Sequence, residues 1–259
     1  MDLILYSWWL ITSDTENGNL TIKWEIMKII ILNSGLGSRL GNLTENVPKS
    51  LVEINSNQTI FSRAINILSN YSKDFIITTG YLNDVLIDYT KNNFPDLDFC
   101  FVHNPVYDKT NYIKSIDLIE DINEDIILLH GDLVFSKEVA EKIINANNSS
   151  VVIDSSIELP KDDFKAKIVE NKVNCISTKY FGSDAVACQP FYKLKKEDWK
   201  LWKNKIREFC QDGKTDVYAE NALNLLLNQI SIYPLDILGD LCTEIDDKDD
   251  LKRVRRILK

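Results

Sequence analysis

LNSGLGSRLGNLTENVPKSLVEI, residues 32–54, is the stretch that decides the fold of this chain. It begins at the end of a short apolar run, residues 28–32, whose composition is typical of a buried β-strand. A strand that leads into a glycine-rich turn often binds phosphate, because glycines tolerate positive φ angles and let backbone N–H groups approach oxygens closely. The stretch therefore predicts a phosphate-binding loop at the carboxyl end of a first strand.

Two common phosphate-binding motifs do not fit this loop. A Walker A loop needs the pattern GxxxxGK[ST], which occurs nowhere in the chain. The dinucleotide-binding fingerprint needs GxGxxG, but Leu40 stands at the position of its third glycine and Gly41 comes one residue late. Both common motifs therefore fail on spacing.

Outward from this loop, β-branched apolar runs alternate with helical periodicity, which indicates a mostly parallel sheet covered on both faces. In this first half we expect strands at residues 28–32, 74–79, 97–103 and 125–130, and helices at 58–70, 83–92 and 111–119. Beyond residue 150 the connections shorten, which favours antiparallel or mixed pairing. There we expect strands at 151–154, 166–170, 172–177, 185–192 and 230–235, and helices at 195–210, 217–227 and 247–258.

These patterns predict an α/β fold with a Rossmann-like, mostly parallel mixed sheet flanked by helices and a smaller antiparallel part that binds an acceptor. We expect one domain at residues 27–259. The apolar run at residues 3–11 is too short to span a bilayer, and it lacks the flanks of a secretory signal. Residues 1–26 are either an extension upstream of a start at Met27, which we favour, or an extra element packed on the domain.

Composition excludes some functions. The formal net charge of −9 argues against binding of duplex nucleic acid, which needs clustered Lys and Arg, and we expect no membrane partner. The five cysteines are scattered without a CxxC pair, so we expect reduced thiols in a cytoplasmic protein, either a monomer or a homo-oligomer. A small anionic ligand remains compatible with this composition.

The order and spacing of residues across 32–54 closely resemble the signature of the sugar-phosphate and phosphocholine nucleotidyltransferases. The matching positions are Leu32, Gly35, Gly37, Arg39, Leu40, Leu43, Thr44, Pro48, Lys49, Leu51, Val52 and Ile54. The chain departs from the signature at Asn33-Ser34, where Ala-Ala is usual, and at Gly41-Asn42, where proline is common. Neither departure removes a charged group. The resemblance implies a GT-A-like fold and a loop that holds a nucleoside triphosphate.

The two basic residues of this pattern suit attack on an α-phosphate, which requires positive charge near the triphosphate and rigid positioning. Arg39 on the glycine loop and Lys49 after a proline supply that charge, and we expect both to be catalytic. The resemblance assigns the rest of the loop to nucleotide binding. These residues are Leu32, Asn33, Ser34, Gly35, Leu36, Gly37 and Ser38.

Two aspartates are candidate ligands for Mg²⁺. Asp132 follows the expected strand at 125–130, and ligands of open α/β sheets bind at the carboxyl ends of strands, although an aspartate there can also cap a helix. The resemblance implies that Asp132 and Asp246 hold the metal, and carboxylates are ligands that Mg²⁺ accepts while it bridges phosphate oxygens. Neighbouring acidic residues at 247, 249 and 250 can be mistaken for Asp246 or can cap the last helix.

Other residues have weaker claims from the same resemblance. Thr79, Gly80 and Tyr81 match a segment that reads the nucleobase. Asn111 and Ser115 match a helix start near the nucleoside, where a plain helix cap is an equal alternative. Lys179 matches a lysine that contacts the acceptor phosphate, and Glu220 falls where some relatives read the far end of the acceptor.

The short acidic tail around Asp246 resembles the cytidylyltransferase branch, so CTP is the preferred donor. The expected acceptor is a small phosphomonoester or phosphonate, with an amino group or choline as one option, in surface-polysaccharide or phosphonate biosynthesis. A choline cage needs aromatic residues. Candidates are Tyr107, Tyr112, Tyr180, Phe181 and Trp199, most of which we expect in the core. Alternatives are a sugar-1-phosphate nucleotidyltransferase that uses UTP, dTTP or GTP, and a non-catalytic nucleotide sensor.

Overall fold

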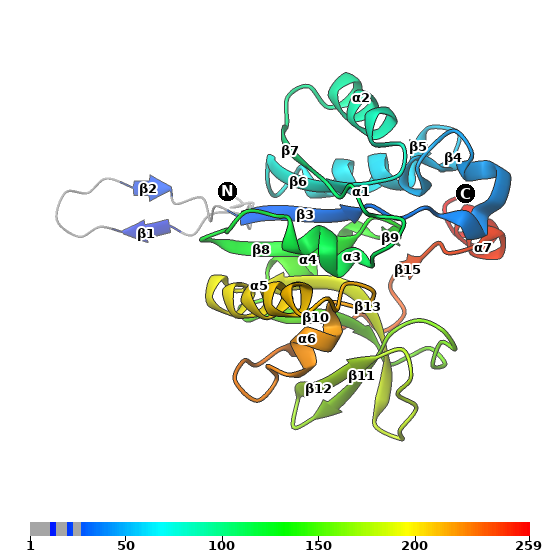
Figure 1. The fold of residues 1–259 in the computed structure, drawn as a ribbon. Helices are drawn as coiled ribbons and strands as arrows, with labels where there is room; N and C mark the ends of the chain where they lie inside the picture. Colours follow the sequence, from blue (N-terminus) through cyan, green and yellow to red (C-terminus); the bar gives the residue numbers. More distant parts are fainter. Residues whose placement is uncertain (1–10, 14–19, 23–26) are drawn as a thin grey trace, which may run out of the picture.

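The fold was obtained as a computed structural model, which describes residues 11–13, 20–22 and 27–259. β1 (Ile11–Ser13) and β2 (Leu20–Ile22) pair antiparallel in a two-stranded sheet that lies away from the central sheet (Figure 1). The apolar run at residues 3–11 lies almost entirely outside the described residues. The status of residues 1–26 therefore stays a prediction.

The first half of the domain forms the parallel part of the central sheet (Figure 1). Its strands are β3 (Met27–Asn33), β6 (Asp74–Thr79), β7 (Asp98–His103) and β8 (Asp125–His130). They lie in the order β8-β3-β6-β7, and each neighbouring pair is parallel. All four strands were predicted from sequence to within one residue at each end.

The second half adds antiparallel strands to the β8 side of the sheet. These strands are β10 (Ser150–Asp154), β11 (Lys165–Val169), β12 (Lys172–Ser177), β13 (Ala185–Leu194) and β14 (Tyr233–Asp236). β13 pairs antiparallel with β8, β10 and β11, whereas β14 pairs parallel with β10. The predicted mixed sheet is confirmed.

Helices cover both faces of the sheet because its strand residues alternate between two cores. In β3, Ile29 and Ile31 face one core while Ile30 and Leu32 face the other. The first core packs against α1 (Ile60–Leu68), α2 (Asn83–Asn93) and α4 (Lys137–Ile144). The second packs against α3 (Tyr112–Asp117), α5 (Lys196–Gln211) and α6 (Glu220–Asn224).

A third, smaller core joins the segment after the glycine loop to the end of the chain. Its buried residues come from η1 (Ser38–Thr44), β4 (Glu53–Asn55), β9 (Leu133–Phe135) and α7 (Lys248–Ile257) and from positions next to other short elements. Those neighbouring elements are η2 (Lys49–Leu51), β5 (Gln58–Thr59) and β15 (Cys242–Glu244). β4 pairs with β5, and β9 pairs with β15. This core brings the two ends of the domain together at the glycine loop.

Several predicted boundaries were wrong. The helix expected at 217–227 is the short α6 followed by turns, and the Asn224 side chain at its end bonds the backbone of Ile176 at 2.8 Å in both directions. The strand expected from 230 begins at Tyr233. The helix expected from 58 begins at Ile60, because Gln58 and Thr59 pair with β4 and the Thr59 side chain caps α1.

The five cysteines all lie in the described part of the chain, and they are free thiols there, as expected. No helix among the described residues is long and apolar enough to cross a membrane.

Candidate active site

The candidate site lies where the order of the parallel strands reverses. From β3 the chain proceeds outward to β6 and β7, and then β8 returns to the opposite side of β3. Loops that follow the strands on either side of such a switch point diverge, and the crevice between them is the usual binding site of an open α/β sheet. Here the two loops are the glycine loop after Asn33 and the Gly131-Asp132 turn.

A cavity of about 520 Å³ opens at this point. The predicted residues that line it are Leu32, Asn33, Ser34, Gly35, Leu36, Lys49, Asn111, Ser115 and Asp132. These residues come from four separate segments, so the fold assembles what the sequence had only suggested. Their individual roles stay predictions.

Four charged side chains meet beside this cavity. Lys49 Nζ lies 2.6 Å from Asp132 Oδ2 and 2.8 Å from Asp246 Oδ1, and Arg39 Nη2 lies 2.8 Å from the same Asp246 oxygen. Burial alone lowers the pKa of Lys49, but the charges of Asp132 and Asp246 and their hydrogen bonds raise it to about 12. Burial raises the pKa of Asp132, but Lys49 and His130 outweigh that effect and hold it below its usual value. Lys49 is therefore a fixed cation near neutral pH.

Pairing of two short strands brings Asp246 to Asp132 across more than a hundred residues of sequence. In the β9–β15 pair, Glu244 lies opposite Leu133, and Ile245 N donates to Asp132 O at 3.1 Å. The next residue, Asp247, caps α7 together with Asp250 in a capping box. The structure thus separates Asp246, which contacts Lys49 and Arg39, from the acidic residues that cap the helix.

The donor set near Asp132 fits a divalent cation of the Mg²⁺ type. Asp132 Oδ1 is buried without a hydrogen-bond partner among the described residues, although the other oxygen of the same carboxylate bonds Lys49. Carboxylate oxygens are the ligands that hard cations prefer. Asp132 and Asp246 present such oxygens beside the cavity, and their role as metal ligands stays a prediction.

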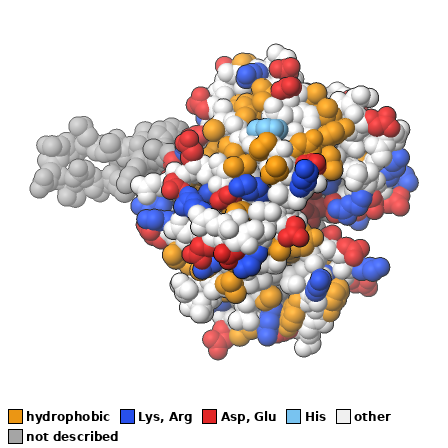
Figure 2. All heavy atoms as spheres, viewed as in Figure 1, with side chains coloured by type: hydrophobic (Ala, Val, Ile, Leu, Met, Phe, Trp, Pro, Cys, Tyr) orange, Lys and Arg blue, Asp and Glu red, His pale blue; other side chains and the backbone are white. Residues whose placement is uncertain are grey.

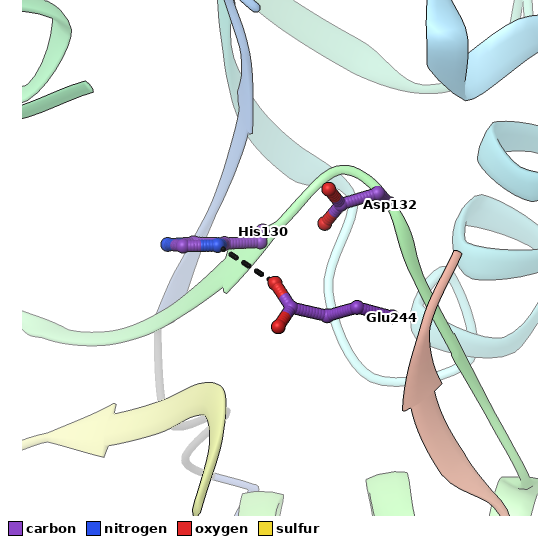
Figure 3. Close-up of side chains that lie close together, drawn as sticks. All are labelled: His130, Asp132 and Glu244. Carbon is purple, nitrogen blue, oxygen red and sulfur yellow. Dashed lines mark hydrogen bonds and ion pairs between the residues drawn. The ribbon is translucent and has the colours of Figure 1, made fainter. Parts of the chain in front are cut away.

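A second acidic residue near Asp132 was not predicted. Potential ligand atoms of His130, Asp132 and Glu244 all lie within 4.8 Å of one another, and His130 Nδ1 is 3.2 Å from Glu244 Oε1 (Figure 3). Burial and the charge of Asp132 raise the pKa of Glu244 to about 7, against the influence of His130. Burial lowers the pKa of His130, but Glu244 raises it above its ordinary value. Figure 3 shows the carboxylates of Asp132 and Glu244 coming from β8's end and from β15.

Asn111 was expected either to cap a helix or to lie near the nucleoside. The structure places it at the start of α3 and at the wall of the cavity. Asn111 caps α3, since its Oδ1 accepts from Tyr112 N at 2.7 Å, and it also lines the cavity. Ser115 Oγ accepts from Asn104 Nδ2 at 3.1 Å. Sequence analysis missed other lining residues, because nothing local to them marks a site. They are Ser50, Asn104, Asp108, Lys109, Thr110, His130, Gly131 and Asp216.

The remaining nucleotide-binding candidates lie just outside this cavity lining. Gly80 packs tightly, because a Cβ atom there would lie 2.4 Å from Ser34 O and 2.7 Å from the side chain of Tyr107. Tyr81 donates its hydroxyl to Glu45 O at 3.0 Å, and Thr79 Oγ1 lies 2.5 Å from Asn83 Oδ1. The segment supports the glycine loop from β6. Gly37 and Ser38 begin η1 on the other side of the loop.

The two acceptor candidates lie away from the cavity lining. Lys179 is exposed after β12, with its backbone N–H on Ser177 Oγ. Glu220 is buried and accepts hydrogen bonds from Tyr112 and Tyr192, the latter at 2.9 Å. Glu220 therefore acts on the cavity through Tyr112, which lines it.

Only two of the five aromatic candidates reach the cavity, Tyr107 and Tyr112. Trp199 is part of the core, as expected for most of the set. Tyr180 bonds Asp184, and Phe181 is exposed with Lys165 Nζ 4.1 Å from its ring centre. The predicted set does not form one cage.

The charges on the face of the molecule seen in Figure 2 are mixed, with Lys and Arg side chains interspersed among Asp and Glu. A protein that binds duplex nucleic acid concentrates basic side chains on one face. On this side of the molecule, the basic side chains of the described residues are spread among acidic ones.

Similarity to known proteins shows the family of this chain. Residues 28–164 match the nucleotidyl transferase family, which is more than half of the chain. The CTP:phosphoglutamine cytidylyltransferase of Campylobacter jejuni is 33% identical over 138 residues, which are 50% of this chain and 53% of that relative. The chain thus spans about half the length of this relative. The choline-phosphate cytidylyltransferase of Streptococcus pneumoniae is 25% identical over 240 residues, 90% of this chain and 99% of its own length.

A solved structure shares the fold. The crystallised CTP:phosphocholine cytidylyltransferase from Streptococcus pneumoniae superposes with a TM-score of 0.75 at 24% identity, and covers 90% of this chain and 100% of its own. The mixed sheet and its flanking helices agree with the fold class expected from sequence. With the family match over residues 28–164, these findings show that the chain belongs to the nucleotidyl transferase family.

Proposed function

We propose that the protein is a Mg²⁺-dependent cytidylyltransferase that transfers CMP from CTP to a small phosphomonoester or phosphonate and releases pyrophosphate. The observation that carries this proposal is the convergence of Lys49, Arg39, Asp132 and Asp246 beside the cavity. Charges of both signs in this arrangement suit a reaction whose substrates are two phosphate anions.

In the proposed reaction an oxygen of the acceptor phosphate or phosphonate attacks the α-phosphorus of CTP in line. The bond from that phosphorus to the oxygen bridging the β-phosphate breaks, and pyrophosphate leaves with the electron pair. A phosphate dianion is already a nucleophile, so the step needs no general base. Rigid positioning and charge stabilisation then supply most of the rate enhancement.

The residues of this chain divide that work. Lys49 holds a positive charge near neutral pH, and with Arg39 it neutralises charge on the triphosphate. Asp132 and Asp246 would hold Mg²⁺, which would supply positive charge to offset the charge of the phosphates. Leu32 to Leu36 and the α3 wall would enclose the nucleoside.

Two lines of support favour CTP. Relatives at 33% and 25% identity are named for CTP-dependent transfer to a phosphorylated amino compound or to choline phosphate. The acidic tail that follows Asp246 resembles the cytidylyltransferase branch. An amino or choline group on the acceptor agrees with the tyrosines and acidic residues at the cavity, Tyr107, Tyr112, Asp108 and Asp216. Surface-polysaccharide and phosphonate biosynthesis are the pathways we propose.

A substrate panel tests the proposal. Purified protein with Mg²⁺ is incubated with CTP, UTP, dTTP, GTP or ATP and with phosphocholine, phosphoglutamine, aminoalkyl phosphonates or sugar 1-phosphates, and released pyrophosphate is measured. We expect release with CTP and a non-sugar acceptor, and a CDP-linked product by mass spectrometry. Pyrophosphate release only with UTP or dTTP and sugar 1-phosphates would instead identify the protein as a sugar-1-phosphate nucleotidyltransferase. No release with any pair would refute catalysis.

A further inference from the structure

Asn33, the last residue of β3, carries a buried side-chain amide with no partner. The residue is only 8% exposed, yet neither Nδ2 nor Oδ1 of its side chain has a hydrogen-bond partner among the described residues. Buried amides are almost always hydrogen-bonded, because an unpaired donor or acceptor costs its full desolvation free energy. Asn33 also lines the cavity. Its free donor and acceptor therefore mark a position for a ligand.

The neighbouring contacts show which way this amide faces. A Cβ atom at Gly131 would lie 2.1 Å from Asn33 Oδ1 and 2.5 Å from its Cγ, so the amide lies over Gly131, one residue before Asp132. Ser34 is already engaged, since its hydroxyl donates to Thr78 Oγ1 at 3.0 Å. Of the Asn-Ser pair that replaces the usual Ala-Ala, only Asn33 is free to bind a ligand.

The chemistry of a carboxamide narrows the ligand. A phosphate oxygen can accept from Nδ2, but a fully ionised phosphate has no hydrogen to give Oδ1. A pair of adjacent hydroxyls can do both, with one oxygen accepting from Nδ2 and the other hydroxyl donating to Oδ1. Ribose is joined to the α-phosphate through one ester linkage, so its hydroxyls lie near the phosphate site at Lys49 and Asp132.

From this geometry we infer that Asn33 binds the 2′- and 3′-hydroxyls of the ribose and makes the protein select ribonucleotides over 2′-deoxyribonucleotides. The inference rests on the proposed function, which places the α-phosphate beside Asp132. A site built for a hydroxyl rejects the analogue without it, because the protein atom is then left buried and unpaired. Asn33 is thus a specificity-determining residue for the donor.

Equilibrium binding tests this assignment without turnover. Calorimetry measures the Kd of CTP and 2′-deoxy-CTP, with Mg²⁺ and without acceptor, for the wild type, Asn33→Ala and Asn93→Ala. We expect the Kd of the wild type for CTP to be roughly ten- to a hundredfold lower than its Kd for 2′-deoxy-CTP. Asn33→Ala should reduce that ratio to within about twofold through weaker CTP binding. Asn93→Ala is the matched control and should keep the wild-type ratio, because this exposed amide on α2 bonds Tyr89 O at 2.7 Å and lies outside the cavity lining.

Each other outcome has a defined meaning. If Asn33→Ala weakened the binding of CTP and of 2′-deoxy-CTP by the same factor, the inference would be overturned. Such a result would indicate that Asn33 contacts a phosphate or a metal-bound water instead of the ribose. An unchanged ratio of the two Kd values would overturn it too. Alanine is the residue usual at this position in the family, and Asn33→Ser provides a second variant if Asn33→Ala misfolds. A wild type that binds another ribonucleotide but not CTP would change the proposed donor, and the ratio is then measured with that nucleotide. A wild type that binds no nucleotide refutes the proposed function itself.

Discussion

Lys49 joins the two halves of the candidate site at the scale of single residues. Its ammonium contacts Asp132, at the end of β8, and Asp246, just before α7, while Arg39 shares the second carboxylate. Without this cation the two carboxylates would face each other in a partly buried place, which is unfavourable for like charges. Lys49 therefore holds the two carboxylates together, and in the proposed reaction it also offers positive charge to the substrate.

Substitution of Lys49 by alanine should lower kcat/KM by about a hundredfold or more, because a preorganised charge at a developing anion is typically worth this much. Pyrophosphate release with CTP and the accepted acceptor is the measurement. Lys248→Ala is the matched control, since this exposed lysine bonds only Asn42 Oδ1, at 3.0 Å, in the described contacts. A Lys49→Ala enzyme as fast as the Lys248→Ala enzyme would rule out the role given to Lys49.

Residues of the candidate site differ in how well the sequence predicts that they belong to it. Arg39, Lys49 and Asp132 follow strands or fall in a spaced pattern, so the sequence alone predicts that they approach one another. His130 and Glu244 contact each other across 114 positions, and nothing local to Glu244 marks that contact. The free amide of Asn33 was equally hidden, because burial and missing partners are properties of packing.

At the scale of elements, the small third core decides how the catalytic charges are held. Leu40 follows Arg39 and Ile245 precedes Asp246, and both pack with Leu251 and Val254 of α7. The register of β9 and β15 then sets Asp246 beside Asp132. A helix at the end of the chain thus fixes the positions of two residues from opposite ends of the domain.

Leu251→Ala should lower the free energy of unfolding by about 2–5 kcal/mol and also reduce kcat/KM, because the cavity it leaves loosens Arg39 and Asp246 together. Leu86→Ala, in the core beneath α2, is the matched control. It should destabilise by a similar amount and keep its kcat/KM at temperatures where both variants are folded. Chemical denaturation and pyrophosphate release are the two measurements. Equal kcat/KM values in both variants would contradict the coupling.

Asp236 should make the stability of the β10–β14 edge depend on pH. Its carboxylate accepts hydrogen bonds from Ser155 Oγ at 2.5 Å, Ser155 N at 3.1 Å and Leu238 N at 3.2 Å. Burial raises the pKa of Asp236, but these hydrogen bonds outweigh it and hold the pKa below its ordinary value. A carboxylate whose pKa is lower in the folded protein than in the unfolded chain stabilises the fold at pH values above its unfolded-state pKa of about 3.9. This stabilisation is lost as the pH falls through the folded-state pKa.

Asp236→Asn should therefore lower the free energy of unfolding by about 1 kcal/mol near pH 7, with the difference shrinking toward zero in strong acid. Urea unfolding of both proteins at a series of pH values measures it. A difference that stays constant with pH would assign the effect to shape rather than to charge.

Short elements were the least predictable part of the fold. The parallel strands were predicted almost to the residue, since continuous apolar runs mark strands buried on both faces. β4, β5 and β9 have two or three residues each, too few to show a period. The residues after α6 carry helical spacing but form turns against β12, so tertiary contacts overrode a local preference.

At the scale of the whole molecule, one mixed sheet carries the nucleotide site on its parallel half and extends an antiparallel half beside it (Figure 1). The fold class follows from the order of elements in the sequence, because alternating strands and helices leave few topologies. The acceptor part could not be predicted in the same detail, since Lys179 and Glu220 lie outside the cavity lining.

A chain that begins at Met27 should keep the fold and activity of the full-length chain. All residues that form the three hydrophobic cores in the described part of the chain lie at or after Met27. The thermal midpoint should change by less than about 2 °C, which corresponds to under 1 kcal/mol at this size. Calorimetric scans of both chains measure it. A clearly lower midpoint for the shorter chain would indicate that residues 1–26 pack on the domain.

The central claim is that this fold transfers a nucleotidyl group, and the fate of the α-phosphate tests it most directly. CTP radiolabelled at the α-phosphate is incubated with the protein, Mg²⁺ and the acceptor panel, in parallel with CTP labelled at the γ-phosphate. We predict that the α-label appears in a CDP-linked product while the γ-label leaves as pyrophosphate. A γ-label on the acceptor, or an α-label that never leaves CTP, would contradict the account.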